Sequence, residues 1–396
     1  MKKRVLFVIN SLECGGAEKS LVSLLSVMDY SKYQVDLQMF RVEGMFMGLL
    51  DSNVSILPTL PYIKYCNIDS DAKFSLRYML TRVCTTVGLR MPLSVNGQPL
   101  HDAQRYWKLA GGVFDPMPQK YDVAIAWGQG NPTHFVATKV NADKKIAFVN
   151  VDYIKAGHNK YFDRPYYEEY DYIASVSNAQ QRAMQEVFPD LADRMVTIYD
   201  IRNQKLIEKM AEEYVPYQKE ANTKVFVTVG RIVSPKGYDL AVGAAKHLKE
   251  HGLKFKWYFV GDGPEMGEIQ TLIQRNGLQN IVIPVGAKEN PYPYMKNADV
   301  YVQTSKFEGF CLTLAEARAL HIPPVSTNFD AVYNQLRDGE NGLIVEMNPQ
   351  SIAQAIERFL EDHRLLEKVV SNLKLEHIGN EGEIQKLYDL MEGYRS

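Results

Sequence analysis

The stretch that decides the fold is residues 5–28, VLFVINSLECGGAEKSLVSLLSVM. It begins with a short run of apolar residues, which is typical of a buried parallel strand. A Gly15-Gly16 turn follows, and apolar residues between positions 21 and 28 then recur at helical spacing. A strand, a glycine turn and a helix in this order are the opening of a doubly wound α/β domain. The first residues therefore predict a Rossmann-like domain.

The same alternation continues along the chain and restarts in its second half. In the first half the predicted strands are 34–40, 123–126, 146–149 and 173–176. In the second half the predicted strands are 224–229, 256–260, 281–285, 299–303, 324–327 and 342–345, with helices at 238–250, 266–275 and 312–320. The predicted fold class is α/β, with two Rossmann-like, doubly wound domains.

Domain boundaries follow from this restart. Residues 1–205 form the first predicted domain, with a helical insertion at about 60–118 that contains a helix at 72–87. Residues 206–379 form the second domain, and a closing helix at about 380–396 can pack back on the first.

Composition excludes several classes of protein. The chain has 396 residues and a net charge of −2, so no basic field indicates a nucleic-acid partner. The four cysteines contain no C-x-x-C pair, which excludes a disulfide scaffold and the standard zinc modules. The apolar run after the basic N-terminus is too short for a secretory signal, and no stretch reaches the length of a membrane span. We expect a cytoplasmic protein that is at most peripheral on the inner face of the membrane.

One segment is locally basic. Residues 73–90 carry Lys73, Arg77, Arg82 and Arg90 beside apolar residues. Two interpretations stay open: a surface that docks on anionic lipid, or a packed helix with solvated arginines.

Two cations follow the first strand of the second domain. Arg231 comes just after strand 224–229, and Lys236 precedes the next helix. Ligands of open α/β sheets bind outside the carboxyl ends of the strands, and cations near a helix start favour an anion there. The pair fits a diphosphate, although solvated loop charges would give the same pattern.

Two carboxylates follow the strand at 299–303. Glu308 stands beside Gly309-Phe310, and Glu316 lies on the next predicted helix. A glycine beside Glu308 lets the backbone approach a ligand closely, and amides at the helix start can hold phosphate. One carboxylate for a sugar and one for a ribose would suit a sugar nucleotide. Taken alone, two glutamates eight positions apart also occur by chance.

Together these pieces resemble the retaining glycosyltransferases of family 4, which have the GT-B fold of two Rossmann-like domains facing each other across a cleft. The matching pieces are residues 15–18 (GGAE), 230–231 (GR), 236–237 (KG), 261–264 (GDGP), 290–295 (NPYPYM), 305–310 (SKFEGF) through 316–317 (EA), and 338–343 (DGENGL). They occur in the family's order over nearly the whole chain and are most specific in the second half.

The resemblance implies a role for each matching residue. Arg231 and Lys236 would bind the donor diphosphate, Glu308 the hydroxyls of the donor sugar, and Glu316 the ribose. The further donor-binding residues that it implies are Gly16, Gly263, Val285, Gly286, Gly309 and Phe310. It implies no metal and no cofactor, because cationic side chains and helix dipoles replace a divalent ion.

One position departs from the family. Many relatives carry a histidine after the strand equivalent to 146–149, facing the donor sugar, and this chain has Asn150 there. An asparagine can donate and accept hydrogen bonds but cannot act as a general base. Asn150 joins Arg231, Lys236 and Glu308 as a candidate catalytic residue. His134, His158 and His321 are interpreted as structural or exposed.

The expected function is a retaining, metal-independent hexosyltransferase. It would use a nucleotide-sugar, a UDP-sugar in preference to a GDP-sugar, and glycosylate a hydroxyl of a glycan or lipid-linked acceptor in surface polysaccharide or glycolipid synthesis. A sugar-nucleotide epimerase of the same fold and a catalytically weak sugar-nucleotide-binding protein stay open. A nicotinamide-dependent oxidoreductase is disfavoured, because residues 14–18 do not supply G-x-G-x-x-G.

Overall fold

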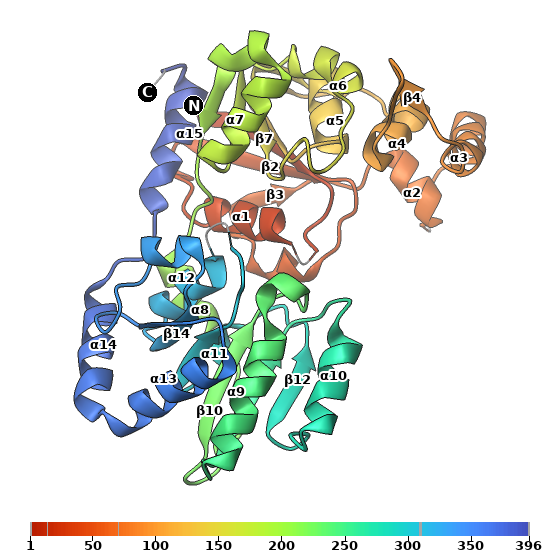
Figure 1. The fold of residues 1–396 in the computed structure, drawn as a ribbon. Coiled ribbons are helices and arrows are strands. Elements are labelled where there is room, and N and C mark those ends of the chain that lie inside the picture. The colour runs from red at the N-terminus through yellow and green to blue at the C-terminus, as the bar shows by residue number, and fades with distance from the viewer. Residues whose placement is uncertain (1, 14, 70, 309–310, 395–396) are drawn as a thin grey trace. The chain divides into compact units, whose positions relative to one another are not determined.

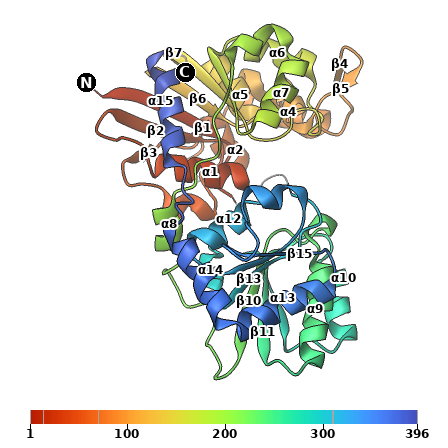
Figure 2. The same cartoon turned by 60° about the vertical axis from the view of Figure 1, so that its left-hand side comes forward.

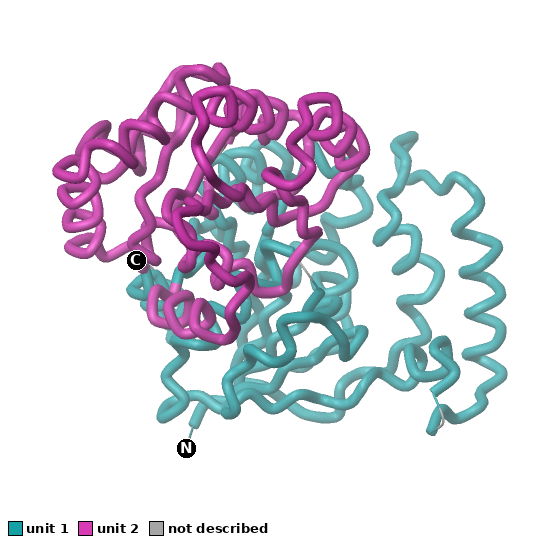
Figure 3. Tube along the Cα trace, turned by 90° about the horizontal axis from the view of Figure 1, so that it is seen from below, with its two compact units in different colours: residues 1–202, 380–396 teal, residues 203–379 magenta. Residues whose placement is uncertain are grey.

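The computed structural model describes residues 2–13, 15–69, 71–308 and 311–394. It divides into two compact units, Met1–Arg202 with Asn380–Ser396 and Asn203–Gly379 (Figure 3). The sequence-based boundaries fall after residues 205 and 379, and those of the structural units fall after Arg202 and Gly379. Each unit is an α/β domain built on a parallel sheet, which confirms the predicted fold class.

The sheet of the first unit has seven strands in the order β3-β2-β1-β6-β7-β8-β9. All neighbours that pair in it are parallel. The strands are β1 Lys3–Ile9, β2 Tyr33–Met39, β3 Val54–Ile56, β6 Lys120–Trp127, β7 Asn141–Val149, β8 Tyr172–Ser175 and β9 Met195–Thr197. The order changes direction between β1 and β6, so the loops after these two strands lie at the topological switch point of this sheet.

Both faces of this sheet are buried, which explains its continuous apolar strands. Val5, Phe7 and Ile9 of β1 belong to one core, and Leu6 and Val8 belong to the other. The first core is closed by α1 Gly16–Leu25 and by α15 Ile384–Glu392, which lie over the same face of the sheet (Figures 1 and 2). The second core is closed by helices that include α5 Asn131–Lys139 and α7 Asn178–Val187.

A helical insertion separates β3 from β6. It contains α2 Pro61–Asn67, α3 Leu76–Gly88, the hairpin β4 Ser94–Val95 and β5 Gln98–Pro99, and α4 Asp102–Ala110. The amide of Asn159, at the start of α6 Lys160–Tyr167, donates to the carbonyls of Val95 and Gln98 at 3.0 and 2.9 Å. The side chain of Gln104 is fully buried and exchanges two hydrogen bonds with the backbone of Asn159. The insertion is therefore tied to the body of its unit.

The sheet of the second unit has six parallel strands in the order β12-β11-β10-β13-β14-β15. They are β10 Lys224–Val229, β11 Phe255–Val260, β12 Val282–Gly286, β13 Val300–Gln303, β14 Pro324–Thr327 and β15 Leu343–Val345. The helices are α8 Gln204–Met210, α9 Tyr238–Glu250, α10 Met266–Arg275, α11 Tyr292–Lys296, α12 Leu312–Ala319, α13 Pro349–Glu361 and α14 His363–Leu375. The order changes direction between β10 and β13, and this marks the switch point of the second sheet.

The loops after β10 and β13 are joined through their backbones. Gly237, at the start of α9, has a φ of +64°, and a Cβ built on it would lie 2.0 Å from the carbonyl oxygen of Thr304. The hydroxyl of Thr304 donates to the carbonyl of Lys236 at 2.9 Å, and the amide of Lys306 donates to the carbonyl of Pro235 at 2.7 Å. Only glycine fits this close approach, so the sequence of the loop determines where Lys236 lies.

Gly252 provides a matched control for the contact between Gly237 and Thr304. It lies just after α9 with a φ of +81°, and a Cβ there would meet no atom within 4 Å. Gly252→Ala should lower the free energy of unfolding by about 1–2 kcal/mol, because an alanine is strained in the left-handed region of the backbone. Gly237→Ala should lower the free energy of unfolding clearly more, because the added methyl also collides with the backbone of Thr304. Chemical denaturation of both variants measures the difference, and equal losses would contradict the importance of the Gly237–Thr304 contact.

Candidate active site

A cation and a carboxylate meet at the switch point of the second sheet. Lys236 comes from the loop after β10, and Glu308 comes from the loop after β13. The Lys236 Nζ lies 2.6 Å from Glu308 Oε1, and the two side chains are 25% and 11% exposed. The structure thus brings together two residues that the sequence predicted to act on one ligand, in the place where doubly wound domains bind ligands.

Two further side chains hold Glu308 in place. The Ser305 hydroxyl donates to Glu308 Oε1 at 2.7 Å, and the Gln303 amide donates to the same oxygen at 3.3 Å. Gln303 also donates to Ser305 Oγ at 2.7 Å, and both residues are buried. The carboxylate is therefore fixed by neutral donors as well as by Lys236. Sequence reasoning missed Ser305 and Gln303, although their polar side chains at the end of a buried strand were a usable signal.

Arg231 is the second predicted cation of this site. It follows β10 directly and is exposed. Within the described part of the chain it has no ion-pair or side-chain hydrogen-bond partner. Arg231, Lys236 and Glu308 together leave one positive charge uncompensated. A planar guanidinium without a partner is suited to bidentate binding of a phosphate.

The remaining predicted residues of the second unit lie at or near the carboxyl ends of its strands. Glu316 is buried on α12 and accepts a hydrogen bond from the Tyr292 hydroxyl at 3.2 Å. Val285 and Gly286 end β12. A Cβ on Gly263 would lie 2.1 Å from the carbonyl oxygen of Ile232, so packing between the loops after β10 and β11 already requires a glycine there. Gly309 and Phe310 lie outside the described residues.

Two predicted residues lie in the first unit. Gly16 begins α1 just after β1, and a Cβ there would meet no atom within 4 Å. Asn150 follows β7 directly. Its amide nitrogen and oxygen are both buried, and neither has a hydrogen-bond partner among the described residues. An unpaired buried amide is costly, so such a group is available to a ligand. The roles of Gly16 and Asn150 in donor binding stay predictions.

The backbone around Asn150 is held by two glutamines that sequence reasoning missed. Gln129 lies in the loop after β6, at the switch point of the first sheet. Its side-chain oxygen accepts from the backbone amide of Asn150 at 3.1 Å, and its side-chain nitrogen donates to the carbonyl of Val151 at 2.7 Å. Gln180 on α7 donates to the carbonyl of Asn150 at 3.3 Å. These contacts fix the backbone from which the Asn150 side chain projects.

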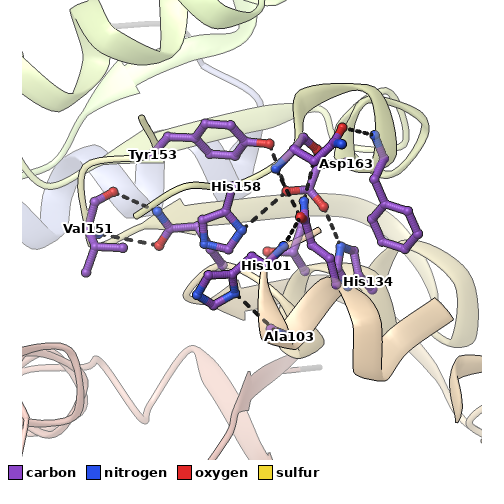
Figure 4. Close-up of polar contacts among 12 residues, drawn as sticks. His101, Ala103, His134, Val151, Tyr153, His158 and Asp163 are labelled. Carbon is purple, nitrogen blue, oxygen red and sulfur yellow. Dashed lines mark hydrogen bonds and ion pairs between the residues drawn. The ribbon is translucent and has the colours of Figure 1, made fainter. Parts of the chain in front are cut away.

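Two histidines interpreted from the sequence as structural or exposed, His134 and His158, belong to one buried cluster. Figure 4 shows His134, His158 and Tyr153 gathered around Asp163. The His134 Nε2 lies 2.8 Å from Asp163 Oδ1, and the Tyr153 hydroxyl donates to Asp163 Oδ2 at 2.8 Å. His158 stacks between the rings of His101 and Tyr153. All members except His101 are buried, so the cluster fits the structural role expected for His134 and His158.

Burial sets the protonation states in this cluster. It lowers the pKa of His158 to about 4, although the Asp163 charge opposes the shift. For Asp163, burial alone would raise the pKa, but the His134 hydrogen bond and charge, with Gln104 and His158, hold it below its usual value. His158 is therefore neutral and Asp163 ionised in the folded protein near neutral pH.

The shift at His158 predicts acid sensitivity. An unfolded histidine takes up its proton near pH 6.5, whereas folded His158 does so only near pH 4. The unfolded state therefore binds more protons in this window, and stability falls as the pH falls through it, by roughly 2 kcal/mol at pH 5. His158→Phe keeps the stacking and removes the titration, so its denaturation free energy should change less between pH 7 and pH 5. The exposed His363→Gln is the control, and equal slopes for all three proteins would contradict the assignment.

The described residues contain no group of three or more His, Cys, Asp or Glu side chains placed to hold a metal ion. None of their helices combines the length and the apolar character needed to cross a membrane.

Comparison with known proteins supports the coarser part of the predicted resemblance, a group 1 glycosyltransferase. Residues 210–376 match the model of the family described as glycosyl transferases group 1. The chain is 25% identical to the Campylobacter jejuni N-acetylgalactosamine-N,N'-diacetylbacillosaminyl-diphospho-undecaprenol 4-alpha-N-acetylgalactosaminyltransferase over 92% of each chain. It is 29% identical to the putative colanic acid biosynthesis glycosyltransferase WcaL of Salmonella typhimurium, and 26% identical to an uncharacterized glycosyltransferase of Methanocaldococcus jannaschii. The alignment with WcaL covers 37% of this chain and 39% of that relative. The alignment with the Methanocaldococcus jannaschii protein covers 43% of this chain and 41% of that relative.

Solved structures share the fold. Anabaena HepE in complex with UDP and glucose superposes with a TM-score of 0.62 at 18% identity, over 98% of this chain and 99% of that one. A mutant of S. aureus TarM in complex with fondaparinux, alpha-GlcNAc-glycerol and UDP superposes with a TM-score of 0.65 at 14% identity, over 99% of this chain and 100% of that one. The comparisons support a group 1 glycosyltransferase with the GT-B fold.

Proposed function

We propose that this protein is a retaining, metal-independent hexosyltransferase of family 4. It transfers a sugar from a nucleotide-sugar, a UDP-sugar by preference, to a hydroxyl of a glycan or lipid-linked acceptor. The observation that carries the proposal is the Lys236–Glu308 pair at the switch point of the second sheet. Arg231 lies in the same loop as Lys236, and its side chain has no partner among the described residues. A site with two cations for a diphosphate and a fixed carboxylate for sugar hydroxyls suits a sugar nucleotide.

The similar proteins supply the choice of substrates. HepE and TarM both have structures with UDP, which favours a UDP-sugar over a GDP-sugar as donor. The name of the Campylobacter jejuni relative gives a diphospho-undecaprenol acceptor, and that of WcaL gives colanic acid biosynthesis. These names support a role in surface polysaccharide or glycolipid synthesis.

Each site residue then has a task. Arg231 and Lys236 neutralise the charge that develops on the diphosphate as it leaves, the work that a divalent metal does elsewhere. Glu308 binds hydroxyls of the donor sugar, and Glu316 binds the ribose. The backbone at Val285–Gly286 contacts the base.

Retention requires that the new bond forms on the face from which the phosphate departs. The bond from the sugar C1 to the phosphate oxygen breaks, and the acceptor oxygen bonds to C1 on the same side. The proton of the acceptor hydroxyl passes to an oxygen of the leaving diphosphate, so no side chain has to act as a base. Asn150 then positions the sugar through hydrogen bonds, which an amide can supply.

The test is a panel of UDP- and GDP-sugars with a metal chelator present throughout. A true donor should raise the unfolding temperature by mass action, and it should be turned over with its own anomeric configuration kept when an acceptor is added. Lys236→Ala should lower turnover by about 10²–10³-fold, because a preorganised charge is lost. Lys246→Ala removes an exposed lysine on α9 and serves as the matched control.

Three outcomes contradict the proposal. Near-normal turnover of Lys236→Ala at saturating donor would remove Lys236 from the mechanism. Loss of turnover in chelator that is restored by a divalent metal would refute metal independence. Conversion of the donor alone, without an acceptor, would indicate the epimerase instead.

Asn150 allows a separate prediction. If it only positions the sugar, Asn150→Ala should lose less turnover than Lys236→Ala, and Asn150→His should change little. A rise of about a hundredfold or more in Asn150→His, the scale of general acid–base catalysis, would mean that this asparagine inactivates the site. The chain would then be a sugar-nucleotide-binding protein with weak activity, and donor binding without turnover in the wild type would identify it as such.

A further inference from the structure

Helix α3 of the insertion exposes its apolar side. Leu76, Leu80, Val83 and Val87 follow one another at intervals of four, three and four residues, which places them on one stripe of the helix. All four are exposed, Leu80 by 55% and Val83 by 57%. Met79 of α3 is exposed as well, and so is Phe74, which precedes the helix and contacts the ring of Tyr65. We name these six side chains the α3 apolar face: Phe74, Leu76, Met79, Leu80, Val83 and Val87.

The opposite side of α3 is fixed against its unit. Thr85 and Gly88 are buried, and a Cβ on Gly88 would lie 2.8 Å from Leu109 of the α4 helix. The ring of Tyr78 packs against those of Tyr62 and Tyr65 at 5.6 and 5.7 Å. Figure 1 shows α3 at the outer edge of its unit, away from the sheet. The helix therefore cannot rotate to bury its apolar face without losing these contacts.

Positive charge borders this face. Lys73, Arg77 and Arg90 are exposed, Arg82 is half-buried, and residues 72–101 contain no Asp or Glu. At about 100° per residue, Arg77 falls on one flank of the stripe, where its guanidinium also pairs with Asp115 at 3.1 Å. Arg82 lies further round the helix and donates to the carbonyl of Tyr65 at 3.5 Å. Among the described residues, Lys73 and Arg90 are therefore the exposed basic side chains of this segment that no carboxylate neutralises. Long basic side chains that flank an apolar stripe can reach phosphate headgroups while the stripe is buried among acyl chains.

We propose that the α3 apolar face inserts into the headgroup region of an anionic membrane. An exposed contiguous apolar patch marks an interaction site, and its basic border selects a negatively charged partner. Two copies of the face could not pair readily, because a two-fold contact would bring the same positive charges together. The inference goes beyond the proposed function and fits an acceptor linked to a membrane lipid.

Binding to vesicles tests the proposal on the full chain without substrates. The protein should co-sediment at low salt with vesicles of phosphatidylcholine and phosphatidylglycerol, and much less with pure phosphatidylcholine. Leu80→Gln/Val83→Gln should weaken binding by about tenfold or more, because the inserted apolar surface is lost. Lys73→Gln/Arg90→Gln should weaken it by about fivefold per charge on the anionic vesicles.

The control replaces two exposed apolar residues of the second unit, Val215→Gln/Leu375→Gln, and should bind like the wild type. Absence of binding to anionic vesicles, or equal binding by the Leu80→Gln/Val83→Gln variant, would overturn the proposal. So would a dimer in sedimentation velocity that dissociates in this variant, since the face would then bind a second copy. Thermal stabilisation by donors, measured on the same samples, shows separately whether the proposed function holds.

Discussion

The contact between the loops after β10 and β13 is the constraint on which the candidate site depends. These loops leave neighbouring strands at the point where the strand order reverses, so each leads to its own helix. The left-handed Gly237 lets the backbone at Thr304 approach without a side chain in between. As a result, Lys236 and Glu308, which are 72 positions apart in the sequence, are held 2.6 Å apart by main-chain packing.

The ion pair also explains how the site can exist before a donor binds. A lone, partly desolvated charge is costly, and Lys236 and Glu308 neutralise each other in the free protein. In the proposed reaction Lys236 turns toward the diphosphate, and Glu308 still accepts hydrogen bonds from Ser305 and Gln303. The carboxylate is thus never left without donors, and the exchange of partners by Lys236 costs little. Arg231 adds the charge that the pair itself lacks.

Sequence reasoning was most accurate where structure is local. Helices 238–250 and 266–275 and strand 224–229 have the predicted bounds, because buried parallel strands are continuous apolar runs that end at glycines. It missed the three-residue strands β3 and β9, each of which contains a hydroxyl residue, whereas the equally short but wholly apolar β15 was predicted. It also missed α5, whose residues 132–137 are all buried, so that the helix has no polar face and no periodicity. In the site, strand-end position found Lys236 and Glu308, and Ser305, only three residues from Glu308, could have been found in the same way. Gln129 could not, because it acts on Asn150 through a contact between two separate loops.

Helix α3 shows the limit of periodicity as a signal. The spacing of Leu76, Leu80, Val83 and Val87 defines a stripe, and such a stripe usually faces the core. Its direction is decided by the other side of the helix, where Gly88 admits the α4 helix and Thr85 is buried. In α3, small and polar residues face the protein and apolar residues face the solvent, which is the reverse of the usual arrangement in a surface helix packed on a core. Because water does not favour that arrangement, the stripe requires a partner whose chemistry matches both its apolar centre and its basic border.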